Sequence, residues 1–348
     1  MKNKQFVQAA FVAGLLLAVG CNNDRMNPET ENNDPVELQI SPVVSLSRGV
    51  IAGDASANQA ALGSVAVYAS GHADYTSQNN YAIYTWGSSW ASGTDKIYLT
   101  NANATIHAHY PAYTPDQAGT PTSTPLKAAN SKIAVTVLET GSIDANGTGI
   151  LASAGEVDYM WATVVAGVNN NSNNTNVTLA MNHALARVSF RVYKAADYFG
   201  TGALSKIVLK NKQNGSSLSK GTSPVMNITD GTITENTAQA ATFTRNISNY
   251  TIGTEKSSAK QVSLLVLPIN TAFDSDAIQL EITVDGAAYT VNLTPPDATL
   301  NGSGNAGKWF AGKNYLYTAK LSGSEFSITT VTVAPWEDKV IGGDLEIK

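Results

Sequence analysis

The chain has 348 residues and a net charge of −5, and 14% of its residues are charged. It holds no cluster of Lys and Arg with interleaved aromatic residues, so we do not expect nucleic acid as a partner. Cys21 is the only cysteine. A disulfide within the chain is therefore excluded, and burial of apolar side chains must hold the fold together. The length allows two domains.

Residues 1–20 have the pattern of a secretory signal peptide. Two lysines precede an apolar run over residues 6–19, which is shorter than the about 20 residues of a membrane-spanning helix. Residues 18–21, AVGC, resemble a bacterial lipobox, in which signal peptidase cuts before a cysteine that is acylated on sulfur. We therefore predict lipidation of Cys21, since two or more acyl chains make a firm anchor. The alternative is an ordinary signal peptide followed by a free thiol.

Residues 21–35 are almost entirely polar and predict a disordered tether. The segment 36-VELQISPVVSLS-47 then alternates apolar and polar residues, which predicts an edge strand with Val36, Leu38 and Ile40 turned inward. Pro42 has no N–H to donate, and we expect it to interrupt the hydrogen-bond ladder of this strand.

The rest of the chain reads as short strands separated by turn residues. The runs rich in β-branched and aromatic residues are 64–70, 81–86, 105–113, 132–139, 157–167, 186–194, 205–210, 261–269, 278–293 and 315–321. Within 278–284 every second residue is apolar, and Asp285-Gly286 then predicts a hairpin. The best helical candidate, 181–188, is short. The pattern favours an all-β fold of sandwich type.

The clearest seam in the sequence is the Asn-rich stretch 168–176. We place a domain boundary there, which gives an N-terminal domain over 36–175 and a C-terminal domain over 176–348. Residues 114–125, rich in Pro, Thr and Gly, predict a long surface loop of the first domain.

The usual catalytic motifs are absent from the sequence: it has no complete phosphate-binding loop G-x-x-x-x-G-K-[ST], no HExxH and no Gly-x-Ser-x-Gly. We therefore expect no catalytic site, no metal and no cofactor. The histidines are His72, His107, His109 and His183. His107 and His109 lie two apart on a predicted strand and face the same side. They could ligate a metal with a third ligand, but polar positions on a strand face are favoured.

Carboxylates and tryptophans provide the remaining candidate sites. The carboxylate pairs are Glu156/Asp158, Asp274/Asp276 and Glu337/Asp338. They could act as acid–base or calcium groups, but solvated loop charges are the favoured interpretation. Trp86 and Trp90 could form a platform for a sugar ring, but core packing or a turn contact is favoured for each.

Several phrases together resemble the fimbrillin family of type V pili, the lipoprotein pilins of Bacteroidales-type outer membranes. They are 158-DYMWA-162, 182-NHALARVSFRV-192, 309-WFAGKNYLYTAKL-321, 331-VTVAPWED-338 and the closing 342-GGDLEIK-348. The resemblance implies two tandem β-sandwich domains of transthyretin-like, Greek-key topology, and no enzymatic activity. It places the chain at the cell surface, in a fimbrium and in the outer membrane. Trp309, Tyr315, Tyr317 and Trp336 should be buried.

The resemblance also implies a way of assembly. A trypsin-like protease cuts fimbrillin precursors after Arg or Lys near the start of the first domain, and a strand from another subunit fills the opened groove. Arg48 follows the alternating segment and matches the cleavage position, so residues 36–48 would be removed. The alternative is a first strand that stays in place, with Arg48 in an exposed turn.

We expect a structural or adhesive fimbrial subunit that binds other subunits and a host or bacterial surface ligand. The rival hypothesis is a monomeric surface lipoprotein that binds glycans through Trp86, Trp90 and the tyrosine-rich residues 75–84. A glycan binder should stay monomeric, whereas a pilin should polymerise after proteolysis.

Overall fold

The computed structural model describes residues 34–44, 62–112, 114–115, 121–122, 132–147, 149–171, 175–235, 237–323 and 325–335. Cys21, Arg48, Trp336 and the pair Glu337/Asp338 lie outside these residues. The predictions of a signal peptide, a tether, a lipid anchor and a cleavage site therefore stay predictions.

Strands are the dominant regular structure of the described residues and the helices are few and short, which confirms the all-β fold. The strands of the first half are β1 (Val36–Glu37), β2 (Gln39–Val44), β3 (Ser64–Ser70), β4 (Tyr81–Trp86), β5 (Trp90–Ser92), β6 (Tyr98–Leu99), β7 (Ala104–Tyr110), β8 (Thr114–Pro115), β9 (Pro121–Thr122), β10 (Lys132–Ala134), β11 (Thr140–Asp144), β12 (Met160–Ala162) and β13 (Val165–Val168). The later strands are β14 (Asn176–His183), β15 (Ala186–Lys194), β16 (Leu204–Asn211), β17 (Val225–Asn227), β18 (Ile233–Thr234), β19 (Thr242–Ser248), β20 (Gln261–Val266), β21 (Ile278–Val284), β22 (Ala287–Asn292), β23 (Lys313–Ser322) and β24 (Glu325–Pro335).

Helices are short in the described part of the chain: α2 (Asp74–Ser77), the 3-10 helix η1 (Lys256–Ser258) and α3 (Ala298–Asn301). Among the described residues, no helix has the length and apolar character that crossing a membrane requires.

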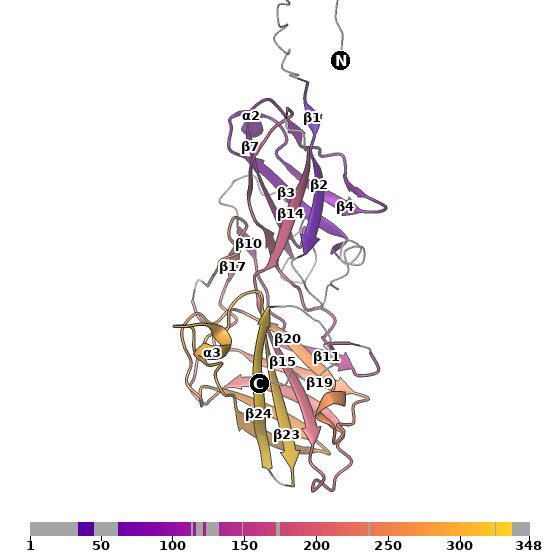
Figure 1. Ribbon diagram of the computed structural model, residues 1–348, viewed down its shortest axis with the longest axis vertical. Coiled ribbons are helices and arrows are strands. Elements are labelled where there is room, and N and C mark those ends of the chain that lie inside the picture. The colour runs from indigo at the N-terminus through magenta and orange to yellow at the C-terminus, as the bar shows by residue number, and fades with distance from the viewer. Residues whose placement is uncertain are drawn as a thin grey trace, which may run out of the picture.

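The strands build two regions along the long axis (Figure 1). The upper region holds a sheet in the order β2-β14-β12-β7-β3-β4-β5, with β13 paired to β7. The lower region holds a sheet in the order β11-β19-β16-β21-β22 and another in the order β20-β15-β23-β24. β1 pairs with β6, β8 with β9, and β10-β17-β18 form a smaller sheet.

Each region has its own apolar core. In β21 every second side chain is buried, as the alternation predicts, and the strand continues through the Asp285-Gly286 turn into its antiparallel partner β22. Asp285 and Gly286 have φ of 51° and 81°, the left-handed backbone of a tight hairpin turn. β15 is a central strand, paired on one edge with β20 and on the other with β23, and most of its side chains are buried.

The division into domains at residues 175 and 176 stays a prediction. Strands that precede residue 175 pair with strands that follow it, in the upper sheet and in a lower sheet alike. β14 follows it and lies in the eight-stranded sheet, whereas β11 precedes it and pairs with β19.

Candidate functional site

Residues 36–44, which contain β1 and β2 and are called the first strand below, form the candidate site. A donor strand would replace this segment if the predicted strand exchange takes place. β2 stands at the end of the eight-stranded sheet and pairs in parallel with β14, from Gln39 beside Asn176 to Val44 beside Met181. The prediction of an edge strand in this segment is thus confirmed for the described residues. β1 pairs antiparallel with β6, so the segment pairs with two different strands.

The inner face of this segment belongs to the upper core. Leu38 is fully buried, and Ile40 and Val44 are each 4% exposed, while Val43 on the other face is 50% exposed. Leu38 and Ile40 therefore point inward as predicted, and Val36 is half-buried. The upper core includes apolar side chains from β6 and β14, namely Leu99, Val177, Leu179 and Met181. Without the first segment, this part of the core would face solvent.

Pro42 does not interrupt the ladder, contrary to the sequence-based expectation. The pairing with β14 is continuous, and Pro42 stands beside Leu179. The N–H of Gln39 donates to the Thr175 carbonyl at 2.9 Å. Since N–H groups alternate in direction along a strand, those of Ile40 and Val44 point away from β14, and the nitrogen of Pro42 lies on that same side. Proline therefore occupies a position where the missing donor costs no bond to β14.

Polar contacts fix the start of the segment. The Tyr84 hydroxyl donates to the Leu38 carbonyl at 2.7 Å. The Glu37 carboxylate accepts from Lys96 Nζ at 2.6 Å and from the Ser92 hydroxyl at 2.8 Å. The Lys96 hydrogen bond holds the pKa of Glu37 below its ordinary value. This ion pair is partly exposed, so it contributes little stability, and the buried apolar face carries most of the attachment.

The histidines take structural positions. His107 and His109 share one face of β7 and are 5% and 1% exposed. The His107 ring lies 5.9 Å from Tyr68, and His109 lies 6.5 Å from Tyr81. Burial lowers the pKa of His109 to about 4, which keeps it neutral. Within the described ranges, no three His, Cys, Asp or Glu side chains gather closely enough to hold a metal ion.

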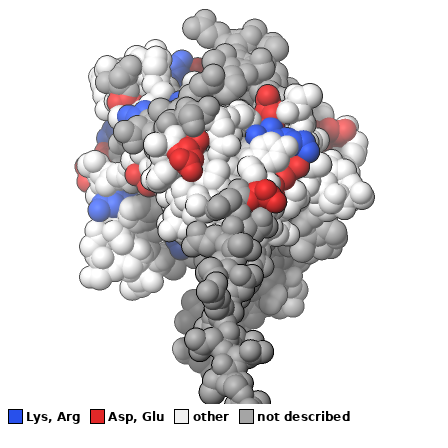
Figure 2. Space-filling view, turned by 90° about the horizontal axis from the view of Figure 1, so that it is seen from above, with Lys and Arg blue, Asp and Glu red and all other residues white. Residues whose placement is uncertain are grey.

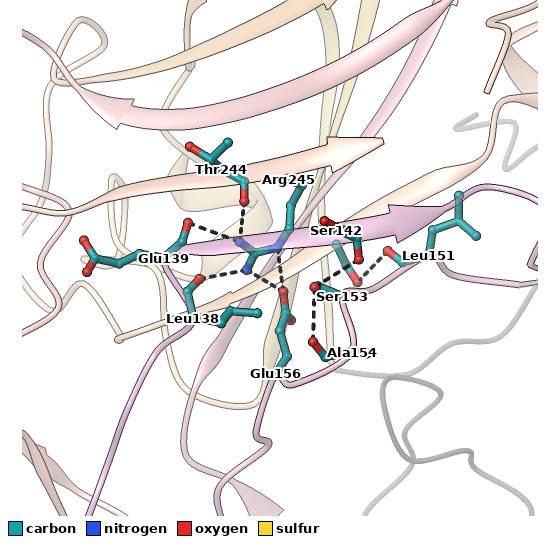
Figure 3. Close-up of polar contacts among 10 residues, drawn as sticks. Leu138, Glu139, Ser142, Leu151, Ser153, Ala154, Glu156, Thr244 and Arg245 are labelled. Atoms are coloured by element: carbon teal, nitrogen blue, oxygen red, sulfur yellow. Dashed lines mark hydrogen bonds and ion pairs between the residues drawn. The ribbon is translucent and has the colours of Figure 1, made fainter. Parts of the chain in front are cut away.

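The carboxylates of Glu156 and Asp158 are not solvated loop charges, and that expectation is wrong for this pair. Glu156 accepts from Arg245 Nε at 2.9 Å, and both side chains are buried (Figure 3). Arg245 also donates to the carbonyls of Leu138 and Thr244 at 3.0 and 2.9 Å. Asp158 lies 2.9 Å from His183 Nδ1, again buried. These groups therefore join segments far apart in the chain.

The Glu156 pair has a clear electrostatic cost. Desolvation raises the pKa of the Glu156 carboxyl, and Arg245 opposes this shift. In the proposed pair Asp274/Asp276, Asp276 forms an ion pair with Lys212. The side chains of Asp276 and Lys212 are both about half exposed. Asp276 is therefore a surface charge, as expected.

The tryptophans do not form a two-ring platform. Trp90 is 6% exposed and belongs to the upper core, with its ring 5.7 Å from that of Trp86. The core interpretation is confirmed for Trp90. Trp309, Tyr315 and Tyr317 are fully buried, as predicted. The Trp309 indole donates to the Tyr317 hydroxyl at 3.2 Å, and its ring lies 5.1 Å from Phe273.

A cleft of about 900 Å³ lies where the two regions meet. Trp161 and Asn182 line it from the upper sheet, and Phe310 lines it from the lower region. The described lining residues include Asp230 and Glu235, and the negative charge of these carboxylates disfavours anions. Sequence reasoning missed this cleft, because its lining comes from loops far apart in the chain.

Comparison with protein families identifies the class of this all-β chain. The fimbrillin-like family model matches residues 50–336, so the chain belongs to this family. The family consists of fimbrial and cell-adhesion proteins and not of enzymes. No match is found among curated proteins.

Solved structures show the same fold. A candidate cell adhesion protein from Bacteroides uniformis is 17% identical, with a TM-score of 0.56 over 87% of this chain and 99% of that one. Another from Bacteroides ovatus is 15% identical, with a TM-score of 0.58 over 88% and 99%. A fimbrial protein from Bacteroides vulgatus is 14% identical, with a TM-score of 0.53 over 86% and 100%. At these identities the likeness concerns the fold alone.

Proposed function

We propose that the chain is a subunit of a cell-surface fimbria that is exported as a lipoprotein and anchored in the outer membrane through Cys21. Membership in the fimbrillin-like family supports the fimbrial role. The lipobox-like residues 18–21 support the anchor. Proteolysis after Arg48 then releases the first strand, and an extended strand of another subunit takes its place. A host or bacterial surface ligand is the proposed target of adhesion.

One observation carries the strand-exchange proposal: the first strand lies at a sheet edge while its inner side chains lie in the core. An edge strand has one neighbour in its sheet, so it can leave without breaking the rest of the ladder. Leu38, Ile40 and Val44 would leave a groove lined by apolar side chains. Extended backbone with alternating apolar residues fits such a groove, because it restores both the hydrogen bonds and the buried contacts.

Arg48→Ala tests this function. Trypsin-treated wild-type protein should form filaments or bind a peptide that copies a partner's strand, and the variant should do neither while keeping its fold and membrane anchoring. Arg25→Ala is the matched control, because this arginine precedes the strand. Assembly of the Arg48→Ala protein at the wild-type level would refute cleavage at this position as the trigger.

Cys21→Ala tests the anchor separately. The variant should stay unprocessed or leave the detergent phase, and mass spectrometry of the wild-type chain before cleavage at Arg48 should find acyl groups on Cys21. An unmodified N-terminus at another residue in the Arg48→Ala protein, which this cleavage cannot shorten, would end the lipoprotein hypothesis.

A further inference from the structure

The cleft where the two regions meet lies apart from the first strand. Its volume of about 900 Å³ falls in the range of small-ligand sites, about 300–1,000 Å³. Its described lining comes from β12 and the end of β14, from the turn between β17 and β18, and from the loops that follow β20 and precede β23. Residues 36–44 are not part of that described lining. A ligand of the cleft would therefore leave strand exchange undisturbed.

Two aromatic residues give the cleft apolar surface. Trp161 of β12 is half-buried and packs against the lower core. A Cβ at Gly231 would lie 2.0 Å from Trp161 Cδ1 and Nε1, so the indole rests directly on the backbone of the β17–β18 turn. Phe310 is also half-buried, and its backbone N–H donates to the Tyr315 hydroxyl at 2.7 Å. Both aromatic residues are thus held by contacts within the chain, which lowers the entropy cost of binding.

Asn182, which lines the cleft beside the indole, can act only as an acceptor towards a ligand. It stands opposite Trp161 in the antiparallel pairing of β12 with β14. Its Nδ2 donates to the Thr163 hydroxyl at 3.1 Å and to the Ala180 carbonyl at 3.0 Å. These two bonds use both N–H groups of the amide, so the amide oxygen is the group that it can offer.

Two carboxylates give the cleft negative charge. Asp230 lies in the β17–β18 turn, and its Oδ1 accepts from the Thr232 N–H at 2.8 Å. Glu235, just beyond β18, accepts from the Ser219 hydroxyl at 2.5 Å. Both donors are neutral groups, so they orient the carboxylates without cancelling their charge. A carboxylate has about four acceptor positions, and each therefore keeps the capacity to bind a ligand.

These groups fit a guanidinium better than other ligand chemistries. A guanidinium offers only N–H donors and carries a permanent positive charge. It stacks on aromatic faces and pairs with a carboxylate through two parallel hydrogen bonds. Carboxylates repel an anion, and a neutral sugar would leave their charge without a counter-charge in the cleft. Oxygen acceptors, negative charge and aromatic rings together match the donors, the charge and the flat shape of an arginine side chain.

The upper end of the molecule lacks this selectivity. Seen from above, Lys and Arg side chains lie there among Asp and Glu side chains and uncharged ones (Figure 2). A surface on which both signs occur side by side does not select a ligand by its charge.

We propose that the cleft binds an arginine side chain that a partner protein presents on its surface. This inference rests on the adhesive role proposed above and names the chemistry of its target. The guanidinium would stack on an aromatic ring of the cleft and pair with its carboxylates. Because Trp161 belongs to the upper sheet and Phe310 to the lower region, the bound side chain would contact both regions.

A peptide with blocked ends tests this chemistry. The probe is acetyl-Gly-Gly-Arg-Gly-Gly-amide, whose only charge is the guanidinium. The comparison peptide carries citrulline, which replaces the guanidinium by a neutral urea group of nearly the same shape. Each of the five tryptophans of the full chain gives one indole NMR signal after nitrogen-15 labelling, and Trp161→Phe identifies that of Trp161. The arginine peptide should shift the Trp161 signal saturably, and the citrulline peptide should bind about 10-fold more weakly or worse.

Three results of this titration would overturn the proposal. The first is equal affinity for the arginine and citrulline peptides. The second is a Trp161 signal that does not respond to the arginine peptide. The third is tighter binding of maltotriose, a neutral sugar, than of the arginine peptide, because it would assign the cleft to carbohydrate.

Removal of charge inside the cleft tests the carboxylates. The double variant Asp230→Asn with Glu235→Gln loses both charges and keeps an oxygen at each position for the hydrogen bonds described above. Its affinity for the arginine peptide should fall about 10-fold or more, with the thermal unfolding midpoint close to that of wild type. The control is Asp197→Asn with Glu255→Gln, which removes two exposed charges outside the described lining and should bind like wild type. An equal effect of the two double variants would overturn the proposal.

Assembly separates this inference from the proposed function. The trypsin-treated cleft variant should still form filaments and bind a peptide that copies a partner's strand, because the groove of the first strand is intact. If wild type neither assembles nor binds that strand peptide, the proposed function fails. If wild type assembles but the arginine peptide does not bind at Trp161, the arginine proposal alone fails.

Discussion

Removal of the first strand should destabilise the upper region by an amount comparable to the stability of a whole domain. Leu38, Ile40 and Val44 are buried almost completely. Full burial of one such side chain contributes about 1.5–3 kcal/mol, so these three contribute about 5–9 kcal/mol. Typical domains unfold with about 5–15 kcal/mol. A chain that begins at Gly49 should therefore be marginally stable until another strand fills the groove.

Denaturant unfolding of this shortened chain measures the loss. Its midpoint should be far below that of the full chain, and a synthetic peptide of residues 34–47 should restore it in a concentration-dependent manner. A peptide with Leu38→Asp and Ile40→Asp should not restore it, since burial of unpaired carboxylates is costly. A peptide with Gln39→Asp is the control, because this side chain is exposed in β2.

Two results would contradict this prediction. If the shortened chain unfolds at the wild-type midpoint, the first strand contributes no stability and its loss opens no groove. If the unchanged peptide and the peptide with Leu38→Asp and Ile40→Asp restore stability equally, the buried face of the strand does not determine its binding.

Three further predictions concern the described cores and turns. Trp309→Ala should cost about 3–5 kcal/mol in denaturant unfolding, and a loss under about 1 kcal/mol would contradict its burial. Glu156→Ala leaves Arg245 buried without its carboxylate and should cost about 3–5 kcal/mol, whereas an unchanged midpoint would show that the pair is hydrated. Hydrogen bonds, above all that from the Thr201 hydroxyl, hold the pKa of Asp285 in the folded chain below its ordinary value of 3.8, so its stabilisation is complete above that value and is lost as the pH falls below it. Wild type should therefore lose stability more steeply with acid than Asp285→Asn, and parallel acid profiles would contradict this.

Local patterns in the sequence predict local structure well. The alternation over 278–284 and the following Asp285-Gly286 turn correspond to β21, its tight turn and β22. The same kind of alternation places Leu38 and Ile40 inward in the first strand. These predictions succeed because the side chains of a strand alternate between its two faces whatever its neighbour is.

Long-range partners leave no trace of this kind in a single sequence. Arg245 lies 89 residues from Glu156, and neither residue type nor spacing indicates that the two meet. Glu156 was therefore expected in solvent, although it is buried. The same limit applies to Pro42. Its missing N–H removes a hydrogen bond of the ladder only if β14 lies on the side to which that N–H would point, and the sequence does not show on which side of β2 its partner lies.

The pairing of β2 with β14 has a consequence for the order of folding. Ser41 and Asn176, which contact each other across this pair, are separated by 135 residues. The first strand of the sheet to be synthesised must therefore wait for the last one. Contacts between such distant residues form slowly, because the entropy of closing the intervening loop is lost before the contact compensates for it. We expect β2 to dock late, after the rest of the eight-stranded sheet. The folding chain then passes through a state in which the groove for β2 is open, and under the proposed function this state precedes any cleavage at Arg48.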